Sequence, residues 1–355
     1  MNNDRIQEIL DLMEEARLDY FLISDPQSIA YCTGYYNDPH ERMFVFMISK
    51  HGNHTLFMND LFYLDHDLDV NIVWHKDGQD AIQTIVDEVH FPGRIGIDKN
   101  WASHFLLDLM KKLPDAKYIN ASPCVDLVRM KKDLQEQVLM IESSKINDAV
   151  MEEIIPFIQE GVTEKQLAKK LDELFFKHHS TCYGAIVAFG KNAADPHHEN
   201  DDTLLRKGDC VLIDMGCVYK GYCSDMTRTF FYEGILEEEI KVYEIVKKAN
   251  EAAEAMIKPG VKLSDIDKCA RKVISDEGYG KYFTHRLGHF IGRDVHEYGD
   301  VSSVNEMEVE EGMIFSIEPG IYLEGNFGVR VEDLVMVTKD GCQVLNSFTK
   351  DIYII

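Results

Sequence analysis

The chain has 355 residues, more than one typical small domain contains, so its length favours two domains. Acidic residues outnumber basic ones by 62 to 37, giving a formal net charge of -25. This charge argues against nucleic acid or an anionic membrane surface as a partner, because both select basic patches. Eight cysteines without a C-x-x-C pair indicate reduced thiols, and no apolar run approaches the ~18 residues of a membrane span. We therefore expect a cytoplasmic protein.

Residues 1–125 alternate between helical and strand patterns. Apolar residues recur at helical spacing from Ile6 to Met13, and residues 81–89 look helical as well. The runs at 43–49, 54–58 and 71–75 look like strands. Such alternation predicts an N-terminal α/β domain built around a central sheet.

A second domain is expected over residues 126–355. The stretch 125–158 is a long amphipathic pattern, which suits a helix that opens this domain. The Thr-x-x-Gln pattern at Thr163 predicts the start of the next helix. Strand patterns follow around residues 185–234, helical patterns occupy 237–257 and 264–278, and strand patterns return after residue 313. The order favours a domain that combines helices with strands.

Four carboxylates and one histidine of the second domain stand beside glycine or strand-forming residues. They are Asp214, Asp225, His289, Glu318 and Glu332. Asp214 ends an apolar strand, where an acid is costly to bury unless a cation or a donor compensates it. Taken alone, the two aspartates are as readily explained as turn and cap residues. The whole set, rich in oxygen and with one imidazole, suits two divalent ions and predicts a dinuclear metallohydrolase.

Three other residues add to this pattern with less force. His197 follows a proline in a loop, where a solvated histidine is the simpler interpretation. His296 lies seven positions after His289, in a glycine-bearing stretch that is not helical. Arg330 has the same parity as Glu332 along a strand, so both should face one side of the sheet. Arg330 could then orient a metal-binding carboxylate or form a plain ion pair.

Four segments together resemble the pita-bread metallopeptidases, in particular the branch of prolidases and aminopeptidases P. They are IDMGCVYKGYCSDMTRTF, THRLGHFIGRDVHE, FSIEPGIYL and GVRVEDLV, in the family's order and spacing. The resemblance implies a creatinase-type N-terminal α/β domain followed by an α+β pita-bread catalytic domain. It also implies that Asp214 binds one metal ion, that His289 and Glu318 bind the other, and that Asp225 and Glu332 bridge the two.

The same resemblance implies roles for the remaining residues and a reaction. A hydroxide generated by the two ions would attack the carbonyl before proline, and Glu318 would shuttle a proton to the leaving nitrogen. His197 and His296 would stabilise the oxyanion and hold the proline end of the substrate. Ligands dominated by carboxylates favour Mn2+, with Co2+ or Zn2+ as other candidates.

Substrate length depends on residues outside the ligand set. Arg293 could pair with the free carboxylate of an Xaa-Pro dipeptide, although a plain surface arginine is an equal interpretation. The segment 37–42 resembles a loop that reaches the partner's active site in dimeric prolidases, where Asp38 and His40 would limit the length of the substrate. Phe290 stands where the family usually has glycine, and its ring should narrow the pocket or shift the strand.

Three alternatives to an Xaa-Pro dipeptidase remain to be weighed. An aminopeptidase P would use the same ligands on longer Xaa-Pro peptides. Methionine aminopeptidases share the ligands but lack an N-terminal domain of this size. A binding protein without catalysis on the same fold would have lost ligands, and none is lost here. We therefore expect a homodimeric dipeptidase that needs two divalent ions.

Overall fold

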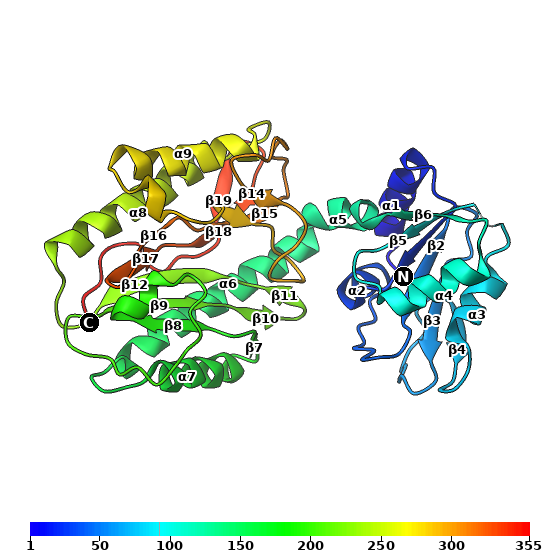
Figure 1. Ribbon diagram of the computed structural model, residues 1–355, viewed down its shortest axis with the longest axis horizontal. Helices are drawn as coiled ribbons and strands as arrows, with labels where there is room; N and C mark the ends of the chain where they lie inside the picture. Colours follow the sequence, from blue (N-terminus) through cyan, green and yellow to red (C-terminus); the bar gives the residue numbers. More distant parts are fainter. Residues whose placement is uncertain (92) are drawn as a thin grey trace. The chain divides into compact units, whose positions relative to one another are not determined.

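The computed structural model describes residues 1–91 and 93–355, and the chain divides into two compact units, Met1–Arg129 and Met130–Ile355 (Figure 1). The elements of the first unit are α1 (Asn3–Glu15), β1 (Tyr20–Ile23), α2 (Pro26–Thr33), β2 (Val45–Ser49), β3 (Thr55–Asn59), β4 (Asn71–His75), α3 (Ala81–Glu88), β5 (Arg94–Ile97), α4 (Ser103–Lys112) and β6 (Lys117–Asn120). Helix α5 (Ser122–Met130) follows at the boundary between the units.

The first unit is a sheet with helices on both faces. Its described strands have the order β4-β3-β2-β1-β5-β6, and β2 runs antiparallel to its neighbours. Alternate residues of β1 enter different cores, because successive side chains of a strand point to opposite faces. Phe21 packs with apolar residues of α1, α2 and α5, whereas Leu22 packs with residues of α3 and α4. This is the α/β architecture that the sequence predicts.

The second unit combines long helices with short antiparallel strands. Its helices are α6 (Leu134–Ile154), α7 (Glu164–Lys177), α8 (Glu237–Met256) and α9 (Leu263–Asp276). Its strands are β7 (Thr181–Cys182), β8 (Ile186–Phe189), β9 (Cys210–Met215), β10 (Cys217–Tyr219), β11 (Tyr222–Cys223), β12 (Met226–Phe231), β13 (Gly288–His289), β14 (Asp300–Val301), β15 (Ile314–Ile317), β16 (Gly320–Leu323), β17 (Phe327–Arg330), β18 (Asp333–Val337) and β19 (Cys342–Val344).

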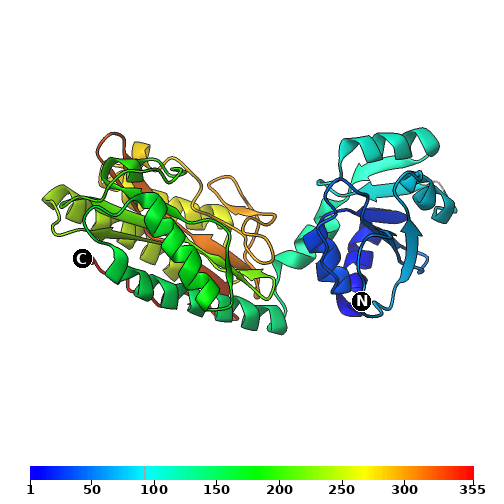
Figure 2. The same ribbon diagram turned by 90° about the horizontal axis from the view of Figure 1, so that it is seen from below.

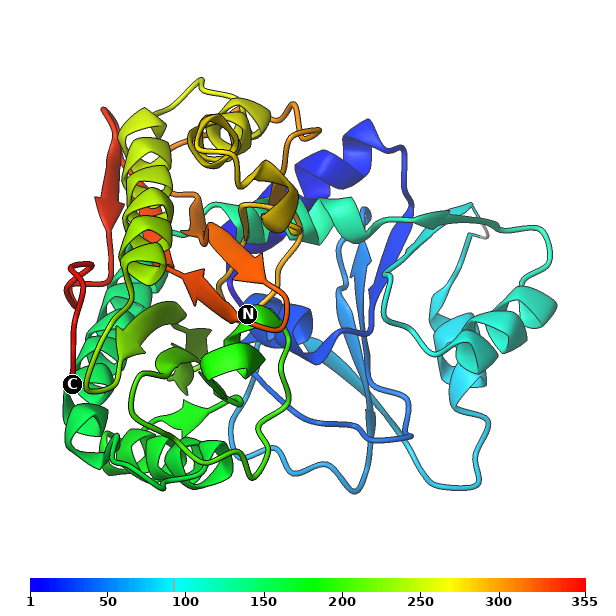
Figure 3. The same ribbon diagram turned by 60° about the vertical axis from the view of Figure 1, so that its left-hand side comes forward.

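The second unit has an earlier and a later half, each made of a helix pair and its strands. In the earlier half α6 and α7 lie side by side and contact β7, β8, β10 and β11 (Figure 2). In the later half α8 packs on α9 and on β15, β16, β17 and β19 (Figure 3). The described sheets are β12-β9-β8, β11-β10-β7, β13-β14, β15-β18-β19 and β16-β17. Of the described helices, none is both long and apolar enough to cross a membrane.

Helix starts follow local sequence closely, with one correction. Thr163 caps α7 and forms a capping box with Gln166, as its Thr-x-x-Gln pattern predicts. The single helix expected over 125–158 is wrong, because α5 and α6 are separated at residues 131–133. There the Lys132 N–H bonds Gly312 O at 2.8 Å, and the Asp133 side chain caps α6. A cap and a long-range backbone bond therefore interrupt the apolar periodicity.

Candidate active site

A cavity of about 700 Å³ opens in the second unit and is lined from both of its halves. Its lining residues are Tyr183, Gly184, Ile186, Pro196, His197, Asp214, Asp225, His285, Arg286, His289, Val295, His296, Glu318, Arg330 and Glu332. All five candidate metal ligands and both candidate active-site histidines are among them. The fold thus gathers residues that lie more than a hundred positions apart in the sequence.

The earlier half contributes two aspartates. Asp214 lies in β9, where it is paired with Thr227 of β12 and Ile186 of β8. Asp225 lies just before β12 and is 5 % exposed. Gly216, between them, lies where a Cβ atom would be 1.9 Å from the Tyr183 hydroxyl and 2.0 Å from the Ser224 carbonyl oxygen. Only glycine fits at this position, because a Cβ atom would overlap both of these oxygens.

The later half contributes His289, Glu318 and Glu332. His289 lies in β13, and its backbone N–H donates to Ser316 Oγ at 3.0 Å. The Nδ1 atom of His289 lies 3.2 Å from the Phe290 carbonyl oxygen, so a proton on Nδ1 leaves Nε2 free to bind a metal. Glu318 follows β15, and Glu332 lies between β17 and β18.

The side chains meet at the base of the cavity. His289 Nε2 lies 3.7 Å from Asp225 Oδ2 and 3.6 Å from Glu318 Oε1. One ligand atom each from Asp225, His289 and Glu332 falls within 4.8 Å of the others. The Oδ1 atom of Asp225 is buried and has no hydrogen-bond partner among the described residues. A buried, unpartnered carboxylate oxygen is costly unless a cation compensates it, so these donors fit bound metal ions.

Burial and mutual repulsion shift the pKa values of this cluster. Burial, with the charges of Asp214 and Glu318, raises the pKa of Asp225 well above its usual range. Burial and the charge of Asp225 do the same to the pKa of Glu332. Burial raises the pKa of Glu318 to about 7, and burial lowers the pKa of His289 to about 3. The imidazole is therefore neutral at pH 7, as a metal ligand must be.

Arg330 connects several of these groups through hydrogen bonds. Its Nη2 donates to Asp214 Oδ2 at 2.7 Å, and its Nε donates to Thr227 Oγ1 at 3.0 Å. Thr227 in turn donates to Glu332 Oε2 at 2.7 Å. Arg330 Nη1 also donates to the Tyr322 hydroxyl at 2.9 Å. This arginine is 3 % exposed, and it bonds Asp214 directly and Glu332 through Thr227.

The two further histidines lie at the exposed side of the cavity. The ring centroids of His296 and His289 are 4.2 Å apart, and the rings meet at 85°. Burial, followed by the charge of Arg286, lowers the pKa of His296. His197 is exposed in its loop, and its backbone N–H is held by Asp195 Oδ1 at 3.0 Å. Both residues line the cavity.

Sequence reasoning gave no role to several residues that line or support the cavity. The His285 ring lies 2.8 Å from the Tyr322 hydroxyl, which extends the chain of contacts through Arg330 to Asp214. Tyr183 donates to the Ser224 carbonyl oxygen at 2.8 Å. Arg286 is exposed, and no ion pair of its guanidinium is found within residues 1–91 and 93–355. The only sequence signal was the position of His285 and Arg286 beside His289.

Three candidates from the sequence do not line the cavity, namely Arg293, Phe290 and the loop of residues 37–42. The Arg293 guanidinium lies over the Tyr222 ring, 5.4 Å from its centroid, and beside Gly221, and Arg293 is not among the residues that line the cavity. The ring of Phe290 is fully buried against Phe315, so the expected narrowing of the cavity is not found in the described part of the chain. Asp38 and His40 occupy an exposed loop of the first unit.

A neutral imidazole among buried carboxylates, at the base of a cavity lined with further histidines, defines a metal-dependent hydrolase. The chain belongs to metallopeptidase family M24, whose model matches residues 138–339. The model of the creatinase/prolidase N-terminal domain matches residues 5–131. The protein is accordingly a metallopeptidase with a creatinase-type first domain and a pita-bread catalytic domain, and divalent ions belong to its site.

Proteins similar to the chain share its full length. An uncharacterized peptidase of Staphylococcus aureus is 34% identical over 98% of this chain and 99% of its own. The structure of a dipeptidase from Pyrococcus horikoshii OT3 has a TM-score of 0.92 at 34% identity, covering 99% of this chain and 100% of that one. The structure of a prolidase from Thermococcus sibiricus has a TM-score of 0.93 at 31% identity, covering 100% and 99%.

Proposed function

We propose that the protein hydrolyses the peptide bond before proline and prefers Xaa-Pro dipeptides. The observation that carries this proposal is the cluster around His289 Nε2, which has carboxylate oxygens of Asp225 and Glu318 within 3.7 Å. The similarity to a protein named as a prolidase supports proline as the recognised residue. A bond to proline needs a dedicated enzyme, because its nitrogen carries no hydrogen for a peptidase to bind.

Two divalent ions fit the cluster in one arrangement. Asp214 would bind one ion, His289 and Glu318 the other, and Asp225 and Glu332 would bridge the two. Bound there, the ions would supply a hydroxide at neutral pH and stabilise the charge that develops on the substrate carbonyl. The predominance of carboxylates favours Mn2+ over Co2+ and Zn2+. The unpartnered Oδ1 of Asp225 supports its bridging role.

Protein side chains would move the proton and hold the substrate. Glu318 lines the cavity beside the His289 ring, so it can carry a proton toward the proline nitrogen as this nitrogen leaves. His296 and His197 line the same cavity on its exposed side. From there they would donate hydrogen bonds to the oxyanion and contact the proline end of the substrate.

Cleavage of matched peptides tests this function and its nearest alternative. With Mn2+ present, we expect the protein to cleave an Xaa-Pro dipeptide. The kcat/KM for the matching Xaa-Ala dipeptide should be at most about one per cent of the value for Xaa-Pro. Cleavage of Xaa-Pro-Yaa should be slower than cleavage of the Xaa-Pro dipeptide. Product release measured by chromatography gives all three values, and assays with Co2+ and Zn2+ identify the preferred metal. Faster turnover of Xaa-Pro-Yaa would instead establish an aminopeptidase P. Protein that retains fewer than two divalent ions would contradict the dinuclear centre.

Two arginines are candidates to bind the carboxylate of a dipeptide, and they can be separated. Arg286 lines the cavity without an ion pair in the described residues, whereas Arg293 lies over the Tyr222 ring. If Arg286 is the anchor, Arg286→Gln raises KM for Xaa-Pro about tenfold or more, since a hydrogen bond to a charged group contributes ~1.5–3 kcal/mol. The matched variant Arg293→Gln then leaves KM nearly unchanged. The reverse result would assign the anchor to Arg293.

Three further proposals concern the whole protein. We propose a homodimer in the cytoplasm, in which Asp38 and His40 help to limit the length of the substrate. Both side chains are exposed in their loop, and the His40 N–H donates to Asp38 Oδ1 at 3.0 Å. Light scattering on the purified protein measures the oligomeric state. Cleavage of Xaa-Pro-Yaa by an Asp38→Ala variant measures the effect of the loop.

A further inference from the structure

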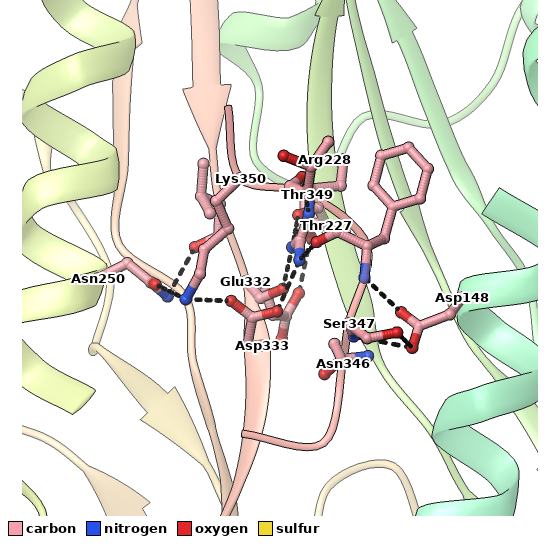
Figure 4. Close-up of polar contacts among 12 residues, drawn as sticks. Asp148, Thr227, Arg228, Asn250, Glu332, Asp333, Asn346, Ser347, Thr349 and Lys350 are labelled. Carbon is pink, nitrogen blue, oxygen red and sulfur yellow. Dashed lines mark hydrogen bonds and ion pairs between the residues drawn. The ribbon is translucent and has the colours of Figure 1, made fainter. Parts of the chain in front are cut away.

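A segment of the second unit runs behind the proposed bridging carboxylates without touching the cavity. It comprises residues 346–350, called here the 346–350 strap, and follows β19 without regular secondary structure. Figure 4 shows the strap beside Thr227, Arg228, Glu332 and Asp333. Of these residues Glu332 lines the cavity, whereas the strap, Thr227, Arg228 and Asp333 do not. Their contacts therefore need an explanation other than substrate binding.

Arg228 is the centre of this contact. It is 1 % exposed, and its Nε donates to Thr349 O at 3.0 Å. Its Nη1 donates to the carbonyl oxygens of Thr227 and Glu332, at 2.9 and 2.7 Å. Its Nη2 donates to Asp333 Oδ1 at 2.7 Å and to Phe348 O at 2.8 Å. Five bonds equal the full donor capacity of a guanidinium, so no other side chain can reproduce this set.

Asp333 forms ion pairs with two basic side chains, Arg228 and Lys350. Its Oδ1 pairs with Arg228, and its Oδ2 lies 2.9 Å from Lys350 Nζ. Lys350 also bonds Glu254 at 2.7 Å and Asn250 Oδ1 at 2.8 Å. Two cations thus meet two carboxylates in a region where an unpaired charge would be very costly. This network fixes the residue that directly follows Glu332.

The other proposed bridging ligand is held by the first residue of the strap. Asn346 Nδ2 donates to the Asp225 carbonyl oxygen at 3.2 Å, and Asn346 Oδ1 accepts from the Leu334 N–H at 2.7 Å. Asp148 anchors the strap from α6, since its carboxylate accepts from the Ser347 N–H and hydroxyl at 2.8 and 2.7 Å. The backbones of Asp225 and Glu332 are therefore tied to one segment.

We infer that the 346–350 strap, through Arg228 and Asn346, positions both bridging carboxylates for two metal ions. The inference rests on the proposed function for the bridging roles. Two carboxylates can share an ion only where the surrounding contacts hold them in one orientation. Bonds to the backbone carbonyl oxygens of Asp225 and Glu332 hold the two residues in place, and a ligand atom of each lies within 4.8 Å of the other. Arg228 and Asn346 are positioning residues, because neither is among the residues that line the cavity.

Titration of Mn2+ into the metal-free protein tests the inference. We expect Arg228→Lys, which keeps the charge, and Asn346→Ala, which is the milder change, to weaken Mn2+ binding about 10- to 100-fold, because support of this kind commonly contributes that much. At saturating Mn2+, KM for an Xaa-Pro dipeptide should stay near the wild-type value. The absorption spectrum of the Co2+ form should also change, since the two ligands no longer hold one orientation.

Ile85→Ala is the matched control, because Ile85 is fully buried in a core of the first unit that includes no strap residue, and it does not line the cavity. It should lower thermal stability and leave Mn2+ affinity unchanged. Folded Arg228→Lys and Asn346→Ala proteins with wild-type Mn2+ affinity would overturn the inference. A wild-type protein that binds two ions but cleaves no Xaa-Pro peptide would overturn the proposed substrate alone. A wild-type protein that binds no Mn2+ would overturn both.

Discussion

Glu332→Gln is expected to lower kcat/KM for an Xaa-Pro dipeptide by about 10³-fold, equivalent to ~4 kcal/mol of transition-state stabilisation. The substitution keeps the shape of the side chain and removes the charge that a bridging ligand shares between two ions. Glutamine can still accept the hydrogen bond from Thr227, which lies 2.7 Å from Glu332 Oε2. The loss should therefore be one of metal binding. Steady-state kinetics together with metal analysis by mass spectrometry would measure it.

A matched control separates the bridging role from a general loss of negative charge. Glu310→Gln removes one carboxylate from an exposed ion pair with Lys131, outside the cavity. Its kcat/KM and its content of two ions should match those of the wild type. If Glu332→Gln also retained two ions and full activity, the assignment of Glu332 as a bridge would be wrong.

The metal-free protein is expected to lose stability as the pH rises from 4.5 toward 7. Glu318 has a pKa near 4.5 in the unfolded chain and about 7 in the folded protein, so only the folded state holds its proton between these values. The free energy of unfolding then falls with rising pH, by roughly 3 kcal/mol for this group. Burial also raises the pKa values of Asp225 and Glu332, so these two groups change the free energy of unfolding in the same direction.

Chemical denaturation of chelator-treated protein at several pH values would measure this loss. Glu318→Gln is the matched variant, because glutamine stays neutral, and its unfolding free energy should fall by roughly 3 kcal/mol less over the same pH range. Adding Mn2+ should restore stability at pH 7, since a cation compensates the ionised carboxylates. Equal pH dependence of the wild type and Glu318→Gln would show that Glu318 is ionised in the folded metal-free protein.

Much of the candidate site could be predicted because charged residues stand within otherwise apolar segments of the sequence. Asp214 and Glu332 are acids within apolar strand patterns, and such positions are rarely filled by a charge without a partner. The glycines around His289 likewise indicated a non-helical backbone, and His289 lies in β13. These patterns are local, so they can be recognised from the sequence alone. The two-domain α/β architecture followed from the same kind of local periodicity.

Contacts between distant segments could not be predicted in this way. The bond between His285 and Tyr322 joins residues 37 positions apart, and neither residue breaks the pattern of its own strand or loop. The interruption between α5 and α6 depends on a backbone bond from Lys132 to Gly312, which belongs to a later turn. Phe290 departs from a family pattern, yet its direction is decided by Phe315 and by the space beside Gly299.

The division of the proposed ligands between two halves would give bound ions a mechanical role. Asp214 and Asp225 come from the earlier half, while His289, Glu318 and Glu332 come from the later one. Shared ions would act as a non-covalent cross-link that closes a very long loop of chain. By mass action, a ligand at a thousand times its dissociation constant contributes ~4 kcal/mol to folding. The supply of metal in the cell would then set the lifetime of the folded enzyme as well as its rate.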